Sequence, residues 1–231
     1  MTEQTNKNFV QWNEAMALKY NPENYYKSHN FIIRFIENLR KKTIIKMLNP
    51  QNDDKIIELG CGAGNLMEAI KSARELVGID LSDFLLNLAR SKKYFVNTKL
   101  IKGNIENLPE EIVNDKFDKI YCSEVLEHVE HPEQVLKEIK KIIKKNGILI
   151  VSIPNENLIN KFKDILIKFK IFNLLFPNLS VRMTDEWHIH LFNLLKFKNL
   201  IANDYSVIKI SRIPLKLIPL RYVIKLKIKY A

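Results

Sequence analysis

The chain has 231 residues, of which 46% are hydrophobic, and a formal net charge of +11. This length fits one globular domain with an elaboration and leaves little room for two full domains. The polar N-terminus does not resemble a signal peptide, and no window reaches the roughly 18 uninterrupted apolar residues of a spanning helix. With only two cysteines, Cys61 and Cys122, we expect a reduced, cytoplasmic protein.

The positive charge is concentrated in the last third of the chain. From Asn155 onward there are 14 lysine and arginine residues against 5 acidic ones, whereas residues 1–154 hold 23 against 21. A field of this sign favours nucleic acid, anionic lipid or a phosphorylated substrate as partner. The alternative is a general lysine-rich bias, because lysine is frequent along the whole chain.

Two helical stretches precede the first predicted strand. One helix begins around Asn8 and carries dense aromatic residues, which either cover an active site or simply pack on the domain. From His29 to Leu48 apolar residues recur at helical spacing, and Asn49-Pro50 ends this amphipathic helix. We therefore expect an N-terminal helical cap over residues 1–48 and one main domain over residues 49–231.

A glycine-rich loop follows the first predicted strand, Lys55–Leu59. Gly60, Gly62 and Gly64 stand in this loop, and a helical pattern from Leu66 to Ala73 follows. Strand, tight turn and helix in this order bring backbone amides close to a ligand, because glycine has no Cβ to keep it away.

Two kinds of nucleotide site use such a loop. A dinucleotide site needs G-x-G-x-x-G, but Asn65 stands where the third glycine belongs. Glu58, two residues before the first glycine, suits a cationic ligand better than a pyrophosphate. The stretch Glu58-Leu59-Gly60-Cys61-Gly62-Ala63-Gly64 resembles the first motif of class I S-adenosylmethionine-dependent methyltransferases. The resemblance implies that Glu58, Gly60, Cys61, Gly62 and Gly64 bind S-adenosylmethionine.

The second and third predicted strands supply the other candidate cofactor contacts. Asp80 ends the second strand 20 residues after Gly60, the spacing at which a carboxylate meets ribose hydroxyls, and Leu81 follows it. The alternative is a surface or capping acid, although Ser82 can cap the helix Asp83–Ser91 equally well. After the third strand, Thr98–Lys102, the resemblance implies that Asn104 and Ile105 contact the adenine.

The fourth predicted strand, Phe117–Ser123, leads to Ser123 and Glu124, which should face the cofactor because ligands bind beyond the carboxyl ends of parallel strands. A helix from Pro132 should stop at Asn146-Gly147, and a fifth strand covers Ile148–Ile153. The segment from Ser123 to His128 is similar to the small-molecule (type 11) and quinone-precursor O-methyltransferases. Altogether we expect an α/β fold with a doubly wound, seven-stranded, mostly parallel sheet.

The remaining segments complete this fold. Leu158 to Phe176 predicts one helix within a lid insertion at about 156–187; the alternative is a helix lying on a membrane surface with its lysines at the border. A helix to about Ala202 and two alternating strands, Tyr205–Ile213 and Tyr222–Tyr230, close the chain. The resemblance implies that the last strand runs antiparallel between the fifth and sixth.

Histidines are the candidate catalytic bases, because removing a proton from an acceptor hydroxyl near pH 7 is their usual task. His128 follows the fourth strand, and His188 and His190 follow the insertion. His131 precedes a proline at a helix start and reads as a surface residue.

A divalent metal is an alternative aid to the same step. Glu124, Glu127 and His128 share one face if Glu124 begins a helical turn, and His188 or His190 would add an imidazole. This set resembles metal-dependent quinone-precursor and RNA 3′-terminal 2′-O-methyltransferases. Many relatives with a similar Glu-His pair are taken to work without metal, so our main expectation is S-adenosylmethionine alone.

Three functions follow from these residues. The first is O-methylation of a small, partly hydrophobic or lipid-like acceptor, with peripheral contact to an anionic membrane through the basic, apolar last third. The second is metal-dependent methylation of RNA 3′ termini, which the missing aromatic-basic pattern of RNA modules disfavours. The third is a cofactor-binding scaffold without catalysis.

Overall fold

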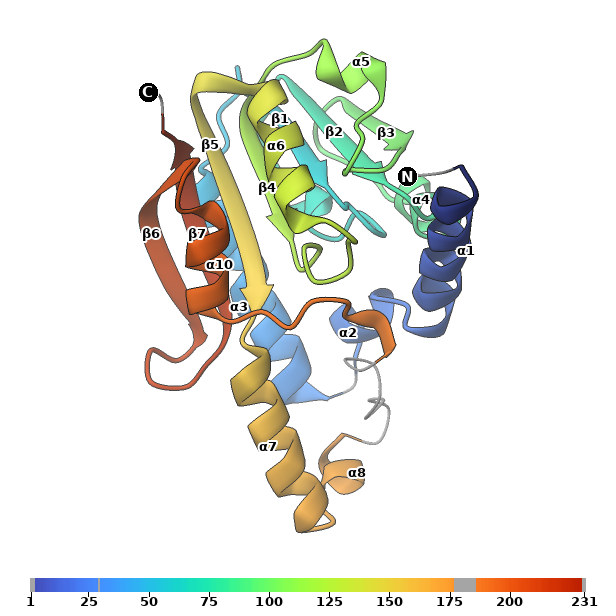
Figure 1. Cartoon of the computed structure of the whole chain (residues 1–231), viewed down its shortest axis with the longest axis vertical. Coiled ribbons are helices and arrows are strands. Elements are labelled where there is room, and N and C mark those ends of the chain that lie inside the picture. Colours follow the sequence, from blue (N-terminus) through green and yellow to red (C-terminus); the bar gives the residue numbers. More distant parts are fainter. Residues whose placement is uncertain (1–2, 29, 177–185, 230–231) are drawn as a thin grey trace.

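The computed structural model describes residues 3–28, 30–176 and 186–229, and its centre is a seven-stranded sheet (Figure 1). The strand order is β3-β2-β1-β4-β5-β7-β6; β1 to β5 pair in parallel, and β7 lies antiparallel between β5 and β6. This confirms the predicted fold class and the place of the last strand. The strands are β1 Lys55–Leu59, β2 Glu75–Asp80, β3 Thr98–Lys102, β4 Phe117–Ser123, β5 Ile143–Pro154, β6 Tyr205–Pro214 and β7 Pro219–Ile228.

Helices cover both faces of the sheet (Figure 1). One buried cluster joins the sheet to α5, α6 and α10, and a second joins it to α3, α4 and the short 3₁₀ helix η1. The apolar stripes of these helices are thereby removed from water, which is the main stabilising term of such a fold. The bounds are α1 Glu3–Lys19, α2 Glu23–Tyr26, α3 Phe31–Leu48, η1 Met67–Ala69, α4 Asp83–Arg90, α5 Glu110–Val113, α6 Pro132–Ile142, α7 Glu156–Lys168, α8 Phe172–Leu175 and α10 Leu194–Ile201.

The helix predicted from Leu66 to Ala73 is wrong in its extent, because only η1 forms there. Ile70 already has extended dihedrals, and Leu66, Met67 and Ile70 are buried against the sheet. The Met67 side chain fills the space above Gly78 of β2, where an added Cβ would lie 2.6 Å from its sulfur. One tight turn therefore buries these side chains, and no helix continues.

The predicted boundary at Asn146-Gly147 is also wrong. Helix α6 ends at Ile142, and β5 starts at Ile143, which pairs with Phe117 of β4. A register shift between Phe117 and Lys119 accommodates the extra residues. Burial of Ile143 in the core outweighs the helical spacing that suggested a longer helix.

The segment after β5 leaves the sheet and projects beyond its carboxyl edge (Figure 1). One helix was predicted from Leu158 to Phe176, but the chain forms α7 and α8, separated at Lys170 by a left-handed φ of +57°. Part of the predicted insertion, residues 177–185, lies outside the described residues, as does Tyr230 of the last predicted strand. Within the described part of the chain, no helix has both the length and the apolarity to cross a bilayer.

Helices α1 and α2 lie beside the carboxyl edge of the sheet, whereas α3 packs on one of its faces (Figure 1). The first begins at Glu3, earlier than the predicted Asn8. Helix α3 ends with Asn49 as its C-cap, as the Asn-Pro signal indicated, and Asn30 caps its N-terminus. Glu14 of α1 accepts a hydrogen bond from the Phe84 N–H at 3.0 Å, where α4 begins. The N-terminal segment is thereby tied to the elements around the glycine loop.

Candidate active site at the carboxyl edge of the sheet

The glycine loop turns back on itself directly after β1. Gly60, Gly62 and Gly64 all have positive φ angles, of +70°, +51° and +73°, which side chains rarely adopt. The N–H groups of Gly60 and Cys61 donate to the Ile79 carbonyl of β2 at 2.8 and 3.0 Å, which pins the loop to the sheet. An added Cβ on Gly60 would lie 2.5 Å from Val125, whereas one on Gly62 would meet nothing nearer than 4.0 Å. The loop therefore has an open side at Gly62.

Two buried carboxyl groups flank this loop. Asp80 at the end of β2 accepts hydrogen bonds from the N–H groups of Gly62 at 2.7 Å and Ser82 at 2.9 Å. Burial raises the pKa of Asp80, and these N–H groups partly offset the effect. Burial also raises the pKa of Glu58 well above its usual range, and its Oε2 has no hydrogen-bond partner among the described residues. A cationic ligand beside the loop fits such an unsatisfied acid.

The turns after β2 and β3 hold three further residues expected to contact the cofactor: Leu81 in the first turn, and Asn104 and Ile105, expected at the adenine, in the second. Leu81 is half-buried, and Ile105 is buried in the core. The side-chain oxygen of Asn104 accepts from the Glu106 N–H at 2.8 Å, forming a local turn. This oxygen keeps a second lone pair, so both it and the amide nitrogen can still bond a ligand.

Ser123 and Glu124 at the end of β4 face other protein groups. Ser123 accepts from Arg40 at 2.6 Å, and Glu124 accepts from the Ser152 hydroxyl at 2.8 Å and pairs with Arg221 at 2.9 Å. Glu124 has a left-handed φ of +55°, so no helical turn begins there. The prediction that Glu124 shares one face with Glu127 and His128 is wrong for this reason.

Sequence reasoning missed the charged residues that complete this part of the edge. Glu37 and Arg40 of α3 are both buried and paired, and Arg221 of β7 approaches the other Glu37 oxygen at 3.6 Å. Burial alone would raise the pKa of Glu37, but the charges of Arg40 and Arg221 outweigh burial and lower it. In the sequence, Glu37 and Arg40 have the spacing of the solvent-exposed face of an amphipathic helix. The one available signal was the i,i+3 pairing of opposite charges.

His128 and His188 come together with Trp187 above the loop that follows β4. The His128 ring lies 4.5 Å from the Trp187 ring and 4.8 Å from the His188 ring, and its Nδ1 is 3.1 Å from the Trp187 carbonyl. Burial, and secondarily His188, lower the pKa of His128 to about 3. His128 is therefore neutral at physiological pH and a poor proton acceptor.

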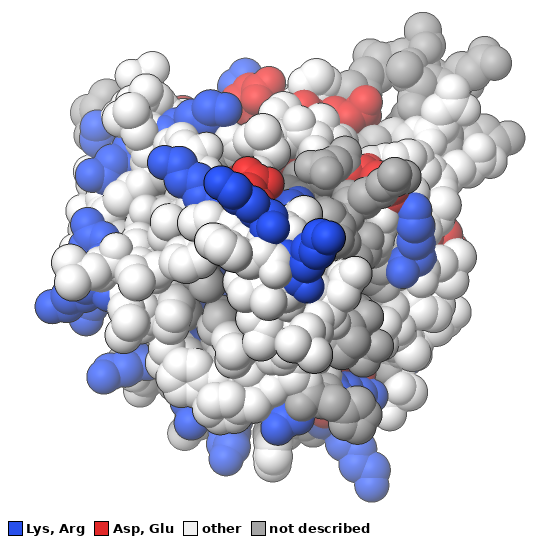
Figure 2. Space-filling view, turned by 90° about the horizontal axis from the view of Figure 1, so that it is seen from below, with Lys and Arg blue, Asp and Glu red and all other residues white. Residues whose placement is uncertain are grey.

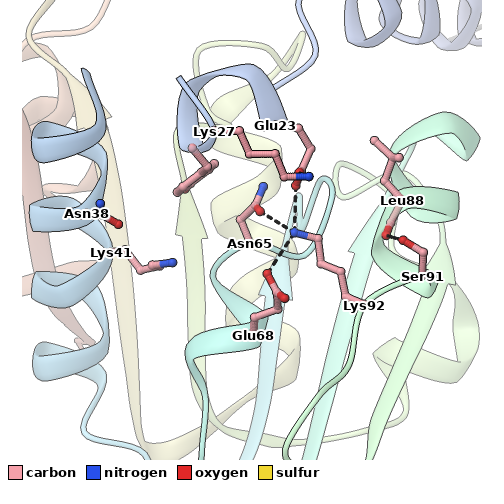
Figure 3. Close-up of a pocket in the computed structure, with 10 residues that line it drawn as sticks. Glu23, Lys27, Asn38, Lys41, Asn65, Glu68, Leu88, Ser91 and Lys92 are labelled. Atoms are coloured by element: carbon pink, nitrogen blue, oxygen red, sulfur yellow. Dashed lines mark hydrogen bonds and ion pairs between the residues drawn. The ribbon is translucent and has the colours of Figure 1, made fainter. Parts of the chain in front are cut away.

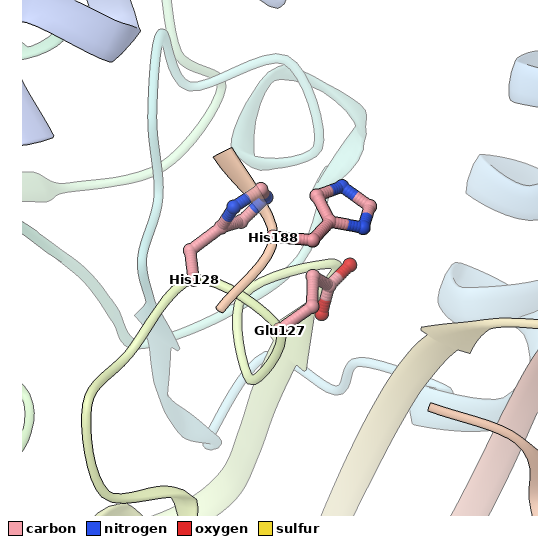
Figure 4. A group of neighbouring side chains, drawn as sticks. All are labelled: Glu127, His128 and His188. Carbon is pink, nitrogen blue, oxygen red and sulfur yellow. The ribbon is translucent and has the colours of Figure 1, made fainter. Parts of the chain in front are cut away.

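Glu127 joins these two imidazoles (Figure 4). Ligand atoms of Glu127, His128 and His188 all lie within 4.8 Å of one another, and Oε2 of Glu127 is buried with no described partner. Burial, and then the charge of Glu124, raise the pKa of Glu127 well above its usual range. One carboxylate and two imidazoles are a donor set that fits a divalent transition metal.

His190 stands apart from this group. Its Nε2 lies 3.0 Å from the Glu130 carbonyl, and its ring packs near Phe192. The backbone N–H groups of Ile189 and His190 both donate to the Glu127 carbonyl, at 2.8 and 3.2 Å. These bonds hold the segment that carries His188 against the loop after β4.

A cleft of about 320 Å³ opens on the flank of the glycine loop, between α2, α3 and α4 (Figure 3). Lys92 crosses it and bonds Glu23 of α2 at 2.8 Å, Glu68 of η1 at 3.0 Å and Asn65 of the loop. Lys92 therefore fastens the N-terminal segment to the glycine loop.

The glycine loop, Asp80 and the imidazole group lie at one edge, on both sides of the point where the strand order reverses between β1 and β4. Arg40 and Glu156 also make contacts at this edge, but no sequence motif identified them. Glu156 follows β5 and pairs with His188 across the edge.

Comparisons with known proteins agree with this geometry. A family model described as a methyltransferase domain matches residues 50–189, more than half of the chain. Two ubiquinone biosynthesis O-methyltransferases are similar in sequence: that of Pelagibacter ubique is 32% identical over 148 residues, 60% of each chain, and that of Aliivibrio fischeri strain MJ11 is 31% identical over 126 residues, 53% of each chain. The chain thus spans little more than half the length of these curated relatives.

Solved structures share the fold. The magnesium protoporphyrin IX methyltransferase of Synechocystis PCC 6803 with bound SAH superposes with a TM-score of 0.67 at 15% identity, covering 97% of this chain and all of that one. An S-adenosylmethionine-dependent methyltransferase of Thermotoga maritima gives 0.63 at 20% identity, covering 95% and 99%. The matched domain, the strand order and the glycine loop together establish that this chain belongs to the methyltransferase-domain family.

Proposed function

We propose that the protein transfers a methyl group from S-adenosylmethionine to a hydroxyl of a small, partly hydrophobic acceptor. One observation carries this proposal: an imidazole and carboxylate group stands at the same sheet edge as a glycine loop with an unsatisfied buried acid, Glu58. The names of the sequence relatives support the acceptor class, since both act in ubiquinone biosynthesis as O-methyltransferases.

The residues divide the task between binding and proton removal. The Gly62 segment, Glu58 and Asp80 would hold the cofactor, which supplies a methyl group on a positively charged sulfur. Methyl transfer then needs the acceptor oxygen held about 3 to 3.5 Å from the methyl carbon. His188 would accept the hydroxyl proton, because His128 has a pKa too low for this role.

The N-terminal segment would act as the cap of this site. Ala17 of α1 is fully buried against Ala63 of the glycine loop and Leu85 of α4, and Lys92 fastens α2 to the same loop. The segment that carries α1 and α2 would therefore have to move for the cofactor to enter, whereas α3 is packed into the core of the sheet and would stay in place.

Calorimetric titration with S-adenosylhomocysteine tests the cofactor part of the proposal. Turnover is then measured on catechols and phenols with and without an alkyl tail, in the wild type and in His188→Gln. We expect binding in both proteins and a loss of turnover of at least a hundredfold in the variant. The exposed His131→Gln is the control. Absence of binding heat would contradict the assignment, and binding without turnover of any acceptor would favour a non-catalytic scaffold.

An anionic membrane surface is the partner that the projecting helices fit. Phe162, Ile165, Phe169, Leu174 and Leu175 of α7 and α8 and the segment between them are exposed by 40 to 79%. The molecule seen from below, the end from which α7 projects, carries lysine and arginine side chains among predominantly uncharged ones (Figure 2). Apolar residues bordered by lysines are the pattern of an interfacial helix. Such a surface would give the protein access to a lipid-like acceptor.

Cosedimentation with vesicles tests this partner. We expect binding to phosphatidylglycerol vesicles that weakens as salt rises, and little binding to phosphatidylcholine vesicles. Equal binding to both lipids, or none, would contradict the proposal.

The Glu127, His128 and His188 group favours one second candidate, metal-dependent methylation of RNA 3′ termini. Metal at this site would lower the pKa of a bound hydroxyl. A steep fall of RNA affinity with salt, together with turnover abolished by a chelator and restored by a divalent ion, would identify this function. Turnover of a hydrophobic phenol in the presence of the chelator would eliminate it.

A further inference from the structure

Glu156 is a buried carboxylate on a helix whose other side chains are exposed or half-buried. It takes the first position of α7, directly after β5, and is the one buried residue of this fully described helix. Its backbone N–H donates to the Phe192 carbonyl at 3.2 Å. An acid in the first turn of a helix is favoured by the helix dipole, but the dipole does not require that the acid be buried. Its burial therefore needs another explanation.

The explanation is a contact with His188, 32 residues further along the chain. Oε1 of Glu156 bonds Nδ1 of His188, and the side chains are 1% and 9% exposed. An ionised carboxylate has no hydrogen to donate, so in a neutral imidazole Nδ1 carries the hydrogen and Nε2 keeps its lone pair. In water, imidazole side chains prefer the other tautomer, with the hydrogen on Nε2. The contact thus selects the less common form.

The backbone around His188 does not by itself fix the ring. His188 lies outside regular structure, and its two following residues are held through the Glu127 carbonyl. Those bonds place the main chain but leave the imidazole free to rotate about its side-chain torsions. The contact with Glu156 fixes the ring, which meets His128 edge to face at an interplanar angle of 83°.

We propose that Glu156 is a positioning residue that holds His188 in the Nδ1–H tautomer and presents Nε2 as a proton acceptor. The effect of this positioning on catalysis rests on the proposed methyl transfer. The tautomer of His188 does not depend on that function. Because Glu156 is the first residue of α7, the same bond links the reactive imidazole to the base of the projecting helix. A carboxylate behind an imidazole also stabilises the cation that forms when the imidazole takes a proton.

Nuclear magnetic resonance of protein labelled with ¹⁵N-histidine tests the tautomer without any acceptor. The five histidines of the chain give few enough signals to assign His188 by substitution. We expect a protonated Nδ1 and a bare Nε2 in the wild type and in Glu156→Gln, whose amide oxygen still accepts the bond. Glu156→Leu should move the hydrogen to Nε2. Glu138→Leu, which removes another buried glutamate on α6 and outside the site, is the matched control and should leave the signal unchanged.

Steady-state kinetics test whether the positioning of His188 by Glu156 affects catalysis. In Glu156→Leu we expect kcat to fall about ten- to hundredfold, as for residues that orient a reactive group, with the acceptor KM and the affinity for S-adenosylhomocysteine within twofold of the wild type. The kcat of Glu156→Gln should lie between the values of the wild type and of Glu156→Leu. A merely structural role predicts instead that KM and cofactor affinity change together with kcat.

The outcomes separate this inference from the function on which it rests. If S-adenosylhomocysteine binds and the His188 tautomer is the same in Glu156→Leu as in the wild type, the positioning role is wrong and the methyltransferase assignment stands. If the tautomer changes as expected but no cofactor binds, the methyltransferase assignment is wrong and Glu156 still positions His188.

Discussion

Glu58 and Asp80 are two acidic residues beside the same loop, and their roles differ. Asp80 has its oxygens occupied by backbone N–H groups and shapes the loop, whereas Glu58 keeps an oxygen without a described partner. A buried acid with a raised pKa holds its proton until a positive charge arrives. Glu58 is thus suited to respond to a cationic cofactor, and Asp80 to hold the site ready for it.

We expect binding of S-adenosylmethionine to release a proton from Glu58. Its pKa is raised by burial in the free protein, and a nearby cation would lower it, so affinity should increase as pH rises through the raised pKa. Calorimetry in buffers of different ionisation enthalpy measures the release. Glu58→Gln should abolish it, and the control Glu75→Gln, at the start of β2, should not. The same release in Glu58→Gln would assign the proton to another group.

Asp80→Asn should weaken S-adenosylhomocysteine binding by about ten- to hundredfold. Asparagine has one acceptor oxygen and cannot serve the Gly62 and Ser82 N–H groups together, and a hydrogen bond to a charged group contributes about 1.5–3 kcal/mol. Titration calorimetry gives the affinity. Asp83→Asn, an exposed acid paired with Lys102, serves as control. Equal affinities in both variants would show that Asp80 does not support the site.

Helix α3 is joined to the sheet by a buried set of charges. Arg40 bonds Glu37 and Ser123, and Arg221 of β7 bonds Glu124 and approaches Glu37. Each charge has an opposite partner, so none is left alone in a low dielectric. This arrangement fixes the end of β4, at the carboxyl edge that carries the candidate site.

Arg40→Leu should destabilise the protein by about 3–5 kcal/mol, because it leaves Glu37 buried with its charge only partly compensated. Urea denaturation measures the loss. The double variant Glu37→Leu/Arg40→Leu should lose less than the sum of the two single variants, since it removes both members of the pair. Additive losses would mean that the two side chains act independently.

The whole molecule has two unlike ends. The carboxyl edge carries the candidate site, helices α1 and α2, and the projecting α7 and α8 (Figure 1). Apolar side chains of α7 and α8 are exposed. At the amino edge, β1 begins at Lys55, and its ammonium pairs with Glu75. This asymmetry places the candidate site and the proposed lipid contact at one end.

Phe169→Asp with Leu174→Asp should abolish binding to phosphatidylglycerol vesicles. These side chains are 66% and 79% exposed, so we expect the melting temperature and cofactor affinity to remain unchanged. Phe95→Asp is the matched control, because Phe95 is 68% exposed and precedes β3 at the opposite edge. Vesicle binding retained by the double variant would mean that α7 and α8 are not the lipid surface.

The sequence by itself determined the alternating strands and helices, the glycine loop and the place of Asp80. These are local signals, because each lies within a few residues of sequence. Glycines mark a turn whose dihedral angles other residues rarely adopt, and an apolar run marks a buried strand. The strand order followed from the family resemblance, which Gly60 to Gly64 carried.

Only the tertiary structure decided which distant polar groups meet. Arg40 and Ser123 are 83 residues apart, and Glu156 and His188 are 32 apart, so no local pattern joins them. The early start of β5 likewise depends on pairing of Ile143 with Phe117 of another strand. Long-range packing selects among conformations that local propensity leaves nearly equal in free energy, and the candidate site is built from those selections.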